Sequence, residues 1–369
     1  MKLAIVADWL TNYGGAENVV SAFHELYPDA PIYTTLFRRD KMRDLATADV
    51  RTSYLQKIPF ARHQLLLPWM PMAIESFDLD EYDVVLSSCH SVAKGVITLP
   101  STLHICYCHT PMRYAWESWD LETRLQQFPR ILHPLIRRQM ESIRRWDRIA
   151  AERADSYIAN SSHVKKRIRQ FYNRDSTVLY PPVRGDYFQP VARPANNYFL
   201  AVGRLIPYKR FDLLIETFNQ LKLPLKIVGI GPDMSRLKSL AGSTVQLMGY
   251  VDSESLRELY ANCTAFLFPQ LEDAGITILE AMCCGRPVIA YDEGGSQDTM
   301  IDGKTGLVFP RQTPGVLMAA IREFHQTEFD PRFIRSHALK FDVERFKEKV
   351  ATAVESQWRE FQSTEPLTK

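Results

Sequence analysis

The stretch that decides the fold is AFLFPQLEDAGITILEAMCCGRPVIAY, residues 265–291. It opens with a short apolar run at 265–269, passes through a polar loop, and continues as an apolar run with helical spacing from about Ile276. After a Gly-Arg-Pro turn, a second apolar run follows at 287–291. A strand, a helix and a strand in this order build parallel sheets. We therefore predict a parallel α/β sheet with its ligand site at the ends of the strands.

Two glutamates flank the point where the loop of this stretch enters the helix. Glu272 falls in the loop, and Glu280 falls one turn past Ile276 on the same helical face. The free N–H groups of the first helical turn face the loop, where they can bind an anion or sugar oxygens. The spacing alone fits two solvated carboxylates equally well, so the site depends on what surrounds these residues.

Apolar runs alternate with helical patterns over nearly the whole chain, which is typical of doubly wound parallel sheets. Helices are expected between the strands, for example at 210–221 and 253–262. The predicted strands are 3–8, 83–88, 103–108 and 156–161 in the first half, and 198–203, 225–230, 245–250, 265–269 and 287–291 in the second.

The pattern restarts once, after a segment at 180–197 that carries four prolines and little periodicity. We predict two Rossmann-like domains joined by a linker at 183–189. The C-terminal amphipathic helix, 342–361, has no strand after it and is expected to cross back to the N-terminal domain. The domains are residues 1–182 with about 342–369, and residues 190–341.

Composition limits the classes of function. The chain has 369 residues, 46% hydrophobic and 24% charged, which fits a globular protein of two domains. A net charge of +2 argues against a broad basic face for nucleic acid. No apolar run approaches ~20 residues, and the N-terminus lacks a signal-peptide pattern, so we expect a cytoplasmic chain. The six cysteines form no C-x-x-C pair, so we expect buried, reduced thiols and no metal site.

Two segments suggest contact with a membrane. Residues 131–150 carry five arginines beside apolar residues at helical spacing, and residues 59–74 are apolar with aromatic and basic residues. Basic amphipathic helices of this kind lie on anionic membrane surfaces. An ordinary core helix with a solvated arginine face is the alternative.

Three further motifs follow predicted strands. Gly14 and Gly15 come after the first strand, where glycines allow a ligand to approach the backbone. Gly203-Arg204 and Lys209 follow the first strand of the second half, where two cations at a helix start can hold a pyrophosphate. His109 follows the strand at 103–108 and can bind a sugar hydroxyl or transfer a proton.

In this order the motifs resemble the retaining glycosyltransferases of family 4, which have the GT-B fold. The resemblance spans essentially the whole chain and is closest to bacterial polysaccharide and O-antigen mannosyltransferases. Its motifs are GGAE at 14–17, HTPMRY at 109–114, ANSSHVKKRI at 159–168, VGRLIPYKRFDLLIE at 202–216, LEAMCCGRPVIA at 279–290 and EGGSQDTMIDGKTGLVF at 293–309.

The resemblance implies a role for each matching residue at a nucleotide-sugar donor. Arg204 and Lys209 neutralise the pyrophosphate, Glu272 binds hydroxyls of the donor sugar, and Glu280 binds the ribose. The backbone amides of Ala274, Gly275 and Ile276 hold the sugar and the phosphate. Gly14 and Gly15 approach the phosphate, and His109 contacts the sugar.

The resemblance further implies transfer of a hexose with retained configuration, without metal or cofactor. We expect mannose from GDP-mannose as donor and a glycan, in the form of a lipid-linked oligosaccharide, as acceptor, at the inner face of the cytoplasmic membrane. A UDP-sugar donor, an epimerase or hydrolase of nucleotide sugars, and a non-catalytic glycan-binding protein are the alternatives. The chain departs from the family pattern at Asp273-Ala274, usually Gly-Phe, and at Asp298, usually Glu.

Overall fold

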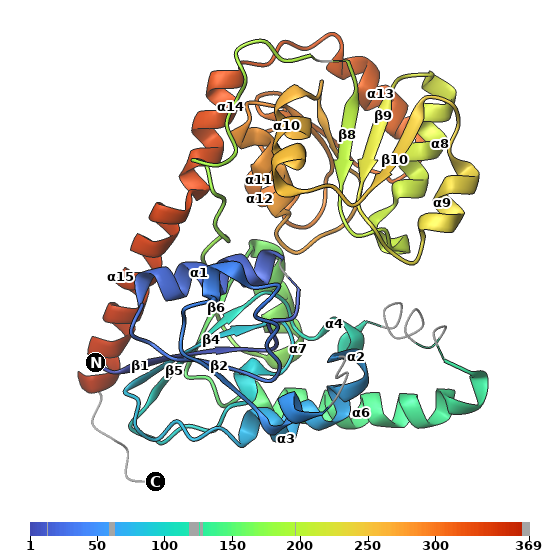
Figure 1. The fold of residues 1–369 in the computed structure, drawn as a ribbon. Coiled ribbons are helices and arrows are strands. Elements are labelled where there is room, and N and C mark those ends of the chain that lie inside the picture. The colour runs from blue at the N-terminus through green and yellow to red at the C-terminus, as the bar shows by residue number, and fades with distance from the viewer. Residues whose placement is uncertain (13, 59–62, 118–124, 126–127, 196, 364–369) are drawn as a thin grey trace. The chain divides into compact units, whose positions relative to one another are not determined.

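The computed structural model describes residues 1–12, 14–58, 63–117, 125, 128–195 and 197–363. The chain forms two compact units, each with its own parallel sheet (Figure 1). Unit 1 is Met1–Pro181 with Phe346–Lys369, and unit 2 is Pro182–Arg345. Each unit is an α/β domain of the predicted class.

Unit 1 contains seven parallel strands in the order β3-β2-β1-β4-β5-β6-β7. β2 and β3 follow β1 toward one edge of the sheet, and β5, β6 and β7 follow β4 toward the other edge. The strand order therefore reverses between β1 and β4. Loops that leave the carboxyl ends of these two strands therefore diverge, and this is where open α/β sheets bind ligands. The strands are β1 (Leu3–Ala7), β2 (Ile32–Thr34), β3 (Val50–Thr52), β4 (Val84–Cys89), β5 (Leu103–Cys108), β6 (Ser156–Ala159) and β7 (Thr177–Val178).

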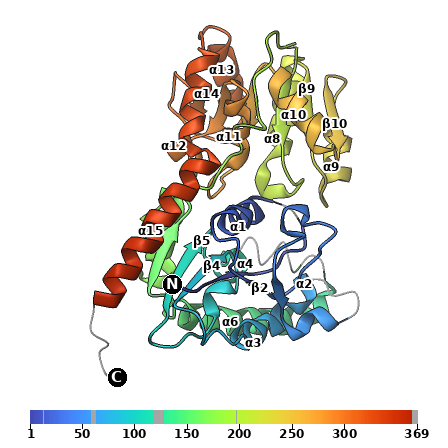
Figure 2. The same ribbon diagram turned by 60° about the vertical axis from the view of Figure 1, so that its left-hand side comes forward.

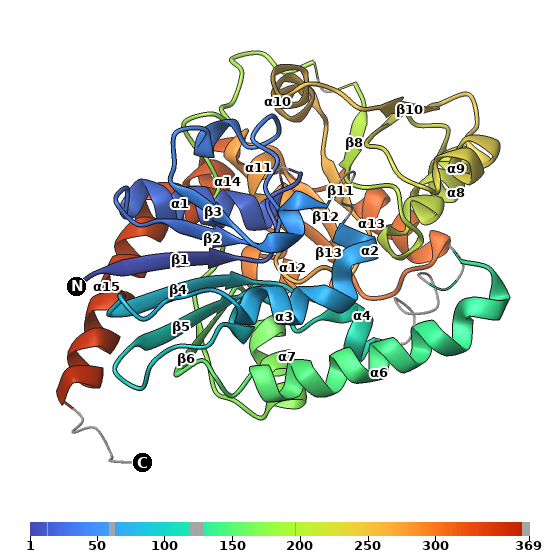
Figure 3. The same cartoon turned by 60° about the horizontal axis from the view of Figure 1, so that its bottom comes forward.

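Helices cover both faces of this sheet. α1 (Gly15–Leu26) lies on one face, and α3 (Met70–Glu75) and α6 (His133–Ala150) lie on the other (Figures 1 and 3). Alternate strand residues face the two layers, as the pleat requires, which makes the strands apolar on consecutive positions. The other helices are α2 (His63–Leu66), α4 (Arg113–Trp116) and α7 (Ser162–Tyr172).

The last helix, α15 (Val343–Ser363), belongs mostly to unit 1 (Figure 2). Its Phe346 stacks on Phe23 of α1 and meets the ring of Tyr107 of β5 edge to face. Aromatic pairs add to the free energy of burial, so this contact fixes the helix against the α1 layer.

Unit 2 contains six parallel strands in the order β10-β9-β8-β11-β12-β13. Here the order reverses between β8 and β11, which places a second ligand-binding position at their carboxyl ends. The strands are β8 (Phe199–Val202), β9 (Leu225–Val228), β10 (Val245–Gly249), β11 (Phe266–Phe268), β12 (Val288–Tyr291) and β13 (Gly306–Phe309).

Two apolar cores lie on the two faces of this sheet. α8 (Phe211–Leu221) and α13 (Pro314–Phe324) share one core, while α10 (Ser253–Asn262), α11 (Ile276–Cys283) and α14 (Pro331–Ala338) share the other (Figure 1). Two shorter helices, α9 (Met234–Leu240) and α12 (Ser296–Thr299), complete the unit.

The predicted α/β class is confirmed, and all nine predicted strands are present. Four strands, β2, β3, β7 and β13, were not predicted; they have two to four residues. The start of α11 at Ile276 and the bounds of α10 are confirmed. All six cysteines are buried, as expected.

The prediction for residues 131–150 needs a correction. The helix begins at His133, and Leu135, one of the apolar residues at helical spacing in this segment, is 55% exposed. Asp147, in contrast, is one of the buried residues of the helix, with 0% exposure. A charge buried in a helix is tolerated only with a partner, and the partner here comes from a distant part of unit 1.

Candidate functional site

The ends of β8 and β11 bring the predicted side chains of unit 2 together. Lys209 lies at the end of the short 3-10 helix η6 (Pro207–Lys209) after β8, and Glu272 lies in the loop after β11. Lys209 Nζ is 2.9 Å from Glu272 Oε1. The hydroxyl of Tyr208 donates to the same oxygen at 3.1 Å. The cation and the carboxylate that the motifs predict separately thus form one pair, with side chains 17% and 19% exposed.

The loop after β8 is shaped so that Lys209 folds back over the strand end. A Cβ added to Gly203 would lie 3.1 Å from Lys209 Nζ, so glycine makes room for the lysine. Arg210 takes a left-handed conformation, with φ of 54°, and turns the chain into α8. Arg204 is exposed, and its side chain makes no hydrogen bond or ion pair within the described residues, so its guanidinium is available at the sheet edge.

The loop from Glu272 to Gly275 rests on a second glycine pair. Gly295 N donates to Glu272 O at 2.9 Å. A Cβ on Gly294 would lie 2.3 Å from Glu272 O, and a Cβ on Gly295 would lie 2.5 Å from the carbonyl of Ala274. Larger residues at either position would push the loop away, so the pair at 294–295 fixes where Glu272 stands.

The start of α11 presents backbone donors beside this loop. Gly275 precedes the helix in a left-handed conformation, with φ of 72°, and no side chain caps the first turn. The N–H groups of Ile276 and Thr277 therefore face the loop end, where the helix dipole favours negative charge. Ala274, Gly275 and Ile276 are half-buried, so this surface remains open to a ligand.

Glu280 lies one turn further along α11. Its Oε2 accepts a hydrogen bond of 2.7 Å from the hydroxyl of Tyr260, which belongs to α10. Burial raises the pKa of Glu280, and the Tyr260 hydrogen bond only partly offsets this. The tyrosine holds the carboxyl group in one orientation. Tyr208 lies inside the quoted motif at 202–216 but was given no role, and Tyr260 lies outside every quoted motif.

The remaining predicted residues lie in unit 1. Gly14 precedes α1 and Gly15 is its first residue, with the Glu17 carboxylate turned back to the backbone of Gly14. His109 follows β5, and its Nε2 is 2.8 Å from Ser88 Oγ. Burial lowers the pKa of His109 to about 3, so its imidazole is neutral at physiological pH.

Sequence reasoning missed a second histidine beside His109. Asp8 follows β1, and its Oδ2 is 2.9 Å from Nδ1 of His90, which follows β4. These residues are 82 positions apart, and no local motif joins them. The one available signal was polar residues at the ends of two predicted strands.

No group of three or more His, Cys, Asp or Glu residues among the described parts of the chain could hold a metal ion. Asp78 and Asp80, which resemble a metal-binding pair, form an exposed turn in which Asp80 N donates to Asp78 Oδ1 at 3.2 Å.

Two family models match consecutive parts of the chain. The model of the family "Glycosyltransferase Family 4" matches residues 13–186, and that of "Glycosyl transferases group 1" matches residues 185–339. Together they span residues 13–339, which include parts of both units and all predicted site residues.

Individual relatives are more distant. The O-antigen chain mannosyltransferase C of Escherichia coli is 30% identical over 54% of this chain and 56% of its own. A GDP-mannose-dependent alpha-(1-6)-phosphatidylinositol monomannoside mannosyltransferase of Mycolicibacterium smegmatis is 33% identical over 42% of this chain and 49% of its own. The matched region thus spans about half the length of these curated relatives.

Solved structures share the fold. The crystal structure of Anabaena Alr3699/HepE in complex with UDP and glucose superposes with a TM-score of 0.72. It covers 96% of this chain and 100% of the other, at 18% identity. At that identity the likeness establishes the fold alone.

Proposed function

Because the chain belongs to the family 4 glycosyltransferases with the GT-B fold, we propose that it transfers a hexose from a nucleotide sugar to a glycan. We propose mannose from GDP-mannose as the donor, in the synthesis of a bacterial surface polysaccharide. The observation that carries the proposal is the Lys209–Glu272 pair at the strand-order reversal of unit 2. The relatives named as mannosyltransferases support the choice of sugar.

The donor would occupy the ends of β8 and β11. Lys209 and Arg204 would face the pyrophosphate, since cations beside a helix start stabilise a leaving phosphate without metal. Glu272 would exchange its contact with Lys209 for hydroxyls of the sugar. The carboxyl group of Glu280, held by Tyr260, would receive the ribose hydroxyls.

The proposed reaction retains the anomeric configuration. The acceptor hydroxyl would attack on the face from which the phosphate leaves, and the leaving phosphate would take the proton of that hydroxyl. The protein would contribute positioning and charge stabilisation rather than a covalent nucleophile. His109 would contribute a neutral imidazole, with Gly14 and Gly15 offering close backbone approach.

A thermal-shift screen of nucleotide sugars tests the donor directly. A ligand at 100 times its Kd stabilises the native state by ~2.7 kcal/mol, which corresponds to a rise of about 5–10 °C in the melting temperature of a domain of this size. We expect this rise with GDP-mannose, and the same rise with EDTA present. No rise with any nucleotide sugar would contradict the proposal.

The same screen, together with an assay of donor consumption, separates the alternatives. A larger rise in melting temperature with a UDP-sugar would show that the donor carries uracil rather than guanine. Consumption of donor without any acceptor would indicate an epimerase or a hydrolase. Stabilisation by glycans alone would indicate a non-catalytic binding protein.

We also propose that the acceptor is lipid-linked and that unit 1 lies on an anionic membrane. α3 and α6 occupy the same face of the unit 1 sheet (Figures 1 and 3). Large apolar side chains are exposed at residues 65–72 and 131–135, and α6 carries exposed arginines, a combination that fits an anionic lipid surface. The apolar residues are Leu65, Trp69, Met72, Ile131, Leu132 and Leu135. Residues 59–62 of the predicted segment 59–74 lie outside the described residues. Within the described residues, no helix is both long and apolar enough to span a bilayer.

Liposome flotation tests this membrane surface. Arg144 is unsuitable for the test, because its Nε donates to Ala115 O and its guanidinium lies over Trp116. Arg138 and Arg145, seven positions apart on α6, are exposed on one helical face. Their joint replacement, Arg138→Glu with Arg145→Glu, is expected to weaken binding to anionic vesicles at least tenfold, since each basic residue contributes ~1 kcal/mol.

The matched control reverses two exposed charges in unit 2, Lys238→Glu with Arg322→Glu. We expect the control to float with anionic vesicles as the wild type does. Equal loss of binding in both variants, or no loss in either, would refute the membrane role of this face.

A further inference from the structure

Unit 1 has its own ligand position where the strand order reverses, between β1 and β4. A small pocket, open to solvent, lies there. Polar side chains from both strand ends and from α1 line it, and the roles given above to the donor site use none of them. The lining includes Asp8, Trp9, Glu17, Ser88 and His90.

Asp8 is held rigidly in the wall of this pocket. It is 1% exposed and accepts hydrogen bonds from four successive backbone amides, those of residues 90–93, with N···O distances between 2.5 and 3.0 Å. Burial alone would raise the pKa of Asp8, but the charge of His90 and these hydrogen bonds lower it to about 2. Asp8 is therefore a carboxylate at any physiological pH.

The carboxylate of Asp8 sets the tautomer of His90. Since Nδ1 of His90 lies 2.9 Å from an ionised oxygen, Nδ1 carries a proton. The rings of Trp9 and His90 pack edge to face, with centroids 4.7 Å apart, so the imidazole is held on two sides. Nε2 has no hydrogen-bond partner among the described residues, and the side chain is 27% exposed toward the pocket.

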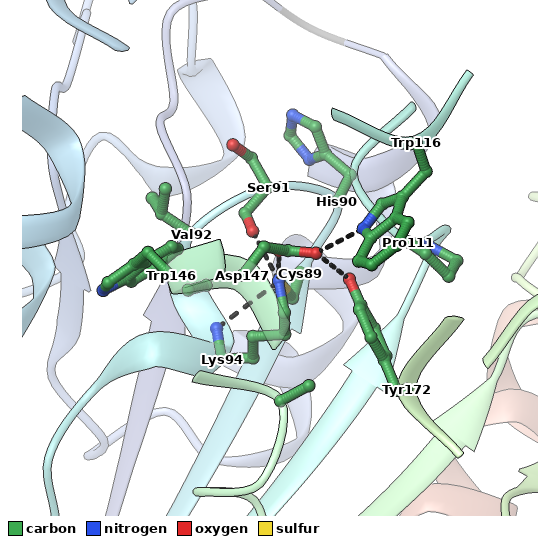
Figure 4. A network of polar contacts seen from close by, with 12 residues as sticks. Cys89, His90, Ser91, Val92, Lys94, Pro111, Trp116, Trp146, Asp147 and Tyr172 are labelled. Atoms are coloured by element: carbon green, nitrogen blue, oxygen red, sulfur yellow. Dashed lines mark hydrogen bonds and ion pairs between the residues drawn. The ribbon is translucent and has the colours of Figure 1, made fainter. Parts of the chain in front are cut away.

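The turn that carries His90 is also held in place by a buried lysine. Lys94, four residues on, is 1% exposed; its Nζ donates to Ser91 O at 2.8 Å and pairs with the buried carboxylate of Asp147. In Figure 4 the side chain of His90 projects away from the Lys94–Asp147 pair. The turn is thus fixed by a carboxylate on each side, and His90 is preorganised before any ligand binds.

We propose that Nε2 of His90 binds a hydroxyl group of the acceptor sugar, with Asp8 as its positioning residue. The proposal rests on the proposed function for the identity of the acceptor as a sugar. At pH values above the pKa of His90 its imidazole is neutral; Nδ1–H is then given to the Asp8 carboxylate, and Nε2 keeps one lone pair that can accept a hydrogen bond from an O–H donor.

The charges around His90 favour a hydroxyl over an anion. Asp8 and Glu17 bring carboxyl groups to the pocket, His109 is neutral, and the charge of Lys94 is matched by Asp147. A phosphate would meet two carboxyl groups and at most one imidazolium. Burial lowers the pKa of His90. The negative charges of Asp8 and Glu17 raise it by more than burial lowers it, so the pKa of His90 lies above its ordinary value. Acidification through that pKa adds a proton to Nε2 and removes the lone pair.

Nuclear magnetic resonance of the imidazole Cε1–H groups tests binding without any assay of transfer. The His90 signal is identified by its loss in His90→Gln. We expect methyl α-mannoside, methyl α-glucoside or methyl α-galactoside to move this signal and to lower its titration midpoint, while inorganic phosphate does not. A His90 signal unmoved by all three glycosides, or moved by phosphate instead, would overturn the proposal.

Kinetics provide the second arm, with His325→Gln as the control because His325 is an exposed histidine of unit 2. We expect His90→Gln to raise the KM for the acceptor roughly 10- to 100-fold, the effect of losing a buried hydrogen bond. We also expect the fall of acceptor kcat/KM at low pH to flatten, with the donor-induced thermal shift unchanged. An acceptor KM within twofold of the wild type would refute the role of His90. If the wild type transfers nothing and no donor stabilises it, the proposed function fails, and the resonance experiment still decides this inference.

Discussion

Replacing Lys209 with alanine is expected to lower transfer at least ~100-fold, the usual cost of losing one preorganised charge that stabilises a transition state. In the resting protein the Nζ group is held 2.9 Å from Glu272 and over Gly203, so its position is fixed before the donor arrives. The lysine is 17% exposed and is not part of either apolar core, so the loss is expected in kcat rather than in folding.

The control for this variant is Lys238→Ala, which removes an exposed lysine of α9 in the same unit. Steady-state transfer and thermal unfolding are measured on both variants. We expect the control to match the wild type in both assays and Lys209→Ala to match it only in unfolding. Near-wild-type turnover of Lys209→Ala would remove the basis for the donor site.

Replacing Lys94 with methionine is expected to destabilise unit 1 by ~3–5 kcal/mol, because it leaves a buried carboxylate without its cation. Lys94 and Asp147 are 1% and 0% exposed and form an ion pair. The other oxygen of Asp147 accepts from Trp116 Nε1 at 2.7 Å and from the Tyr172 hydroxyl at 2.8 Å (Figure 4). The network thus joins the turn after β4 to α4, α6 and α7.

A second change distinguishes an unpaired charge from a simple loss of packing. In Lys94→Met with Asp147→Asn the residue at 147 is neutral, and its amide oxygen can still accept from Trp116 and Tyr172. We expect the double variant to be more stable than Lys94→Met alone. All six tryptophans of the chain belong to unit 1, so tryptophan fluorescence during urea unfolding reports this unit selectively. A single variant within 1 kcal/mol of the wild type, or a double variant less stable than the single one, would contradict this account.

The sequence was sufficient to predict the features that are written in contiguous residues. The alternation of apolar runs predicted nine strands, and the loop-to-helix motif predicted the start of α11 at Ile276. Lys209 and Glu272 were both predicted as site residues, but their ion pair was not, because it depends on how β8 and β11 neighbour each other in the sheet.

The features of unit 1 show what the sequence left out. Asp8 and His90 meet because β1 pairs with β4, although β2 and β3 intervene in the chain. Asp147 carried a usable signal, since it continues the buried positions Ile136, Met140 and Ile143 at helical spacing. An acid at such a position indicates a buried cation elsewhere, but not which one.

Calorimetric titration of GDP-mannose into the wild type and into Lys209→Ala tests the central claim most directly, namely that the ends of β8 and β11 bind a nucleotide sugar. The account predicts saturable heat with one site per chain for the wild type, and binding at least tenfold weaker for the variant, since charge-assisted hydrogen bonds to phosphate contribute ~1.5–3 kcal/mol. Saturable binding of equal strength in both proteins, or no heat with GDP-mannose or with any UDP-sugar, would contradict it.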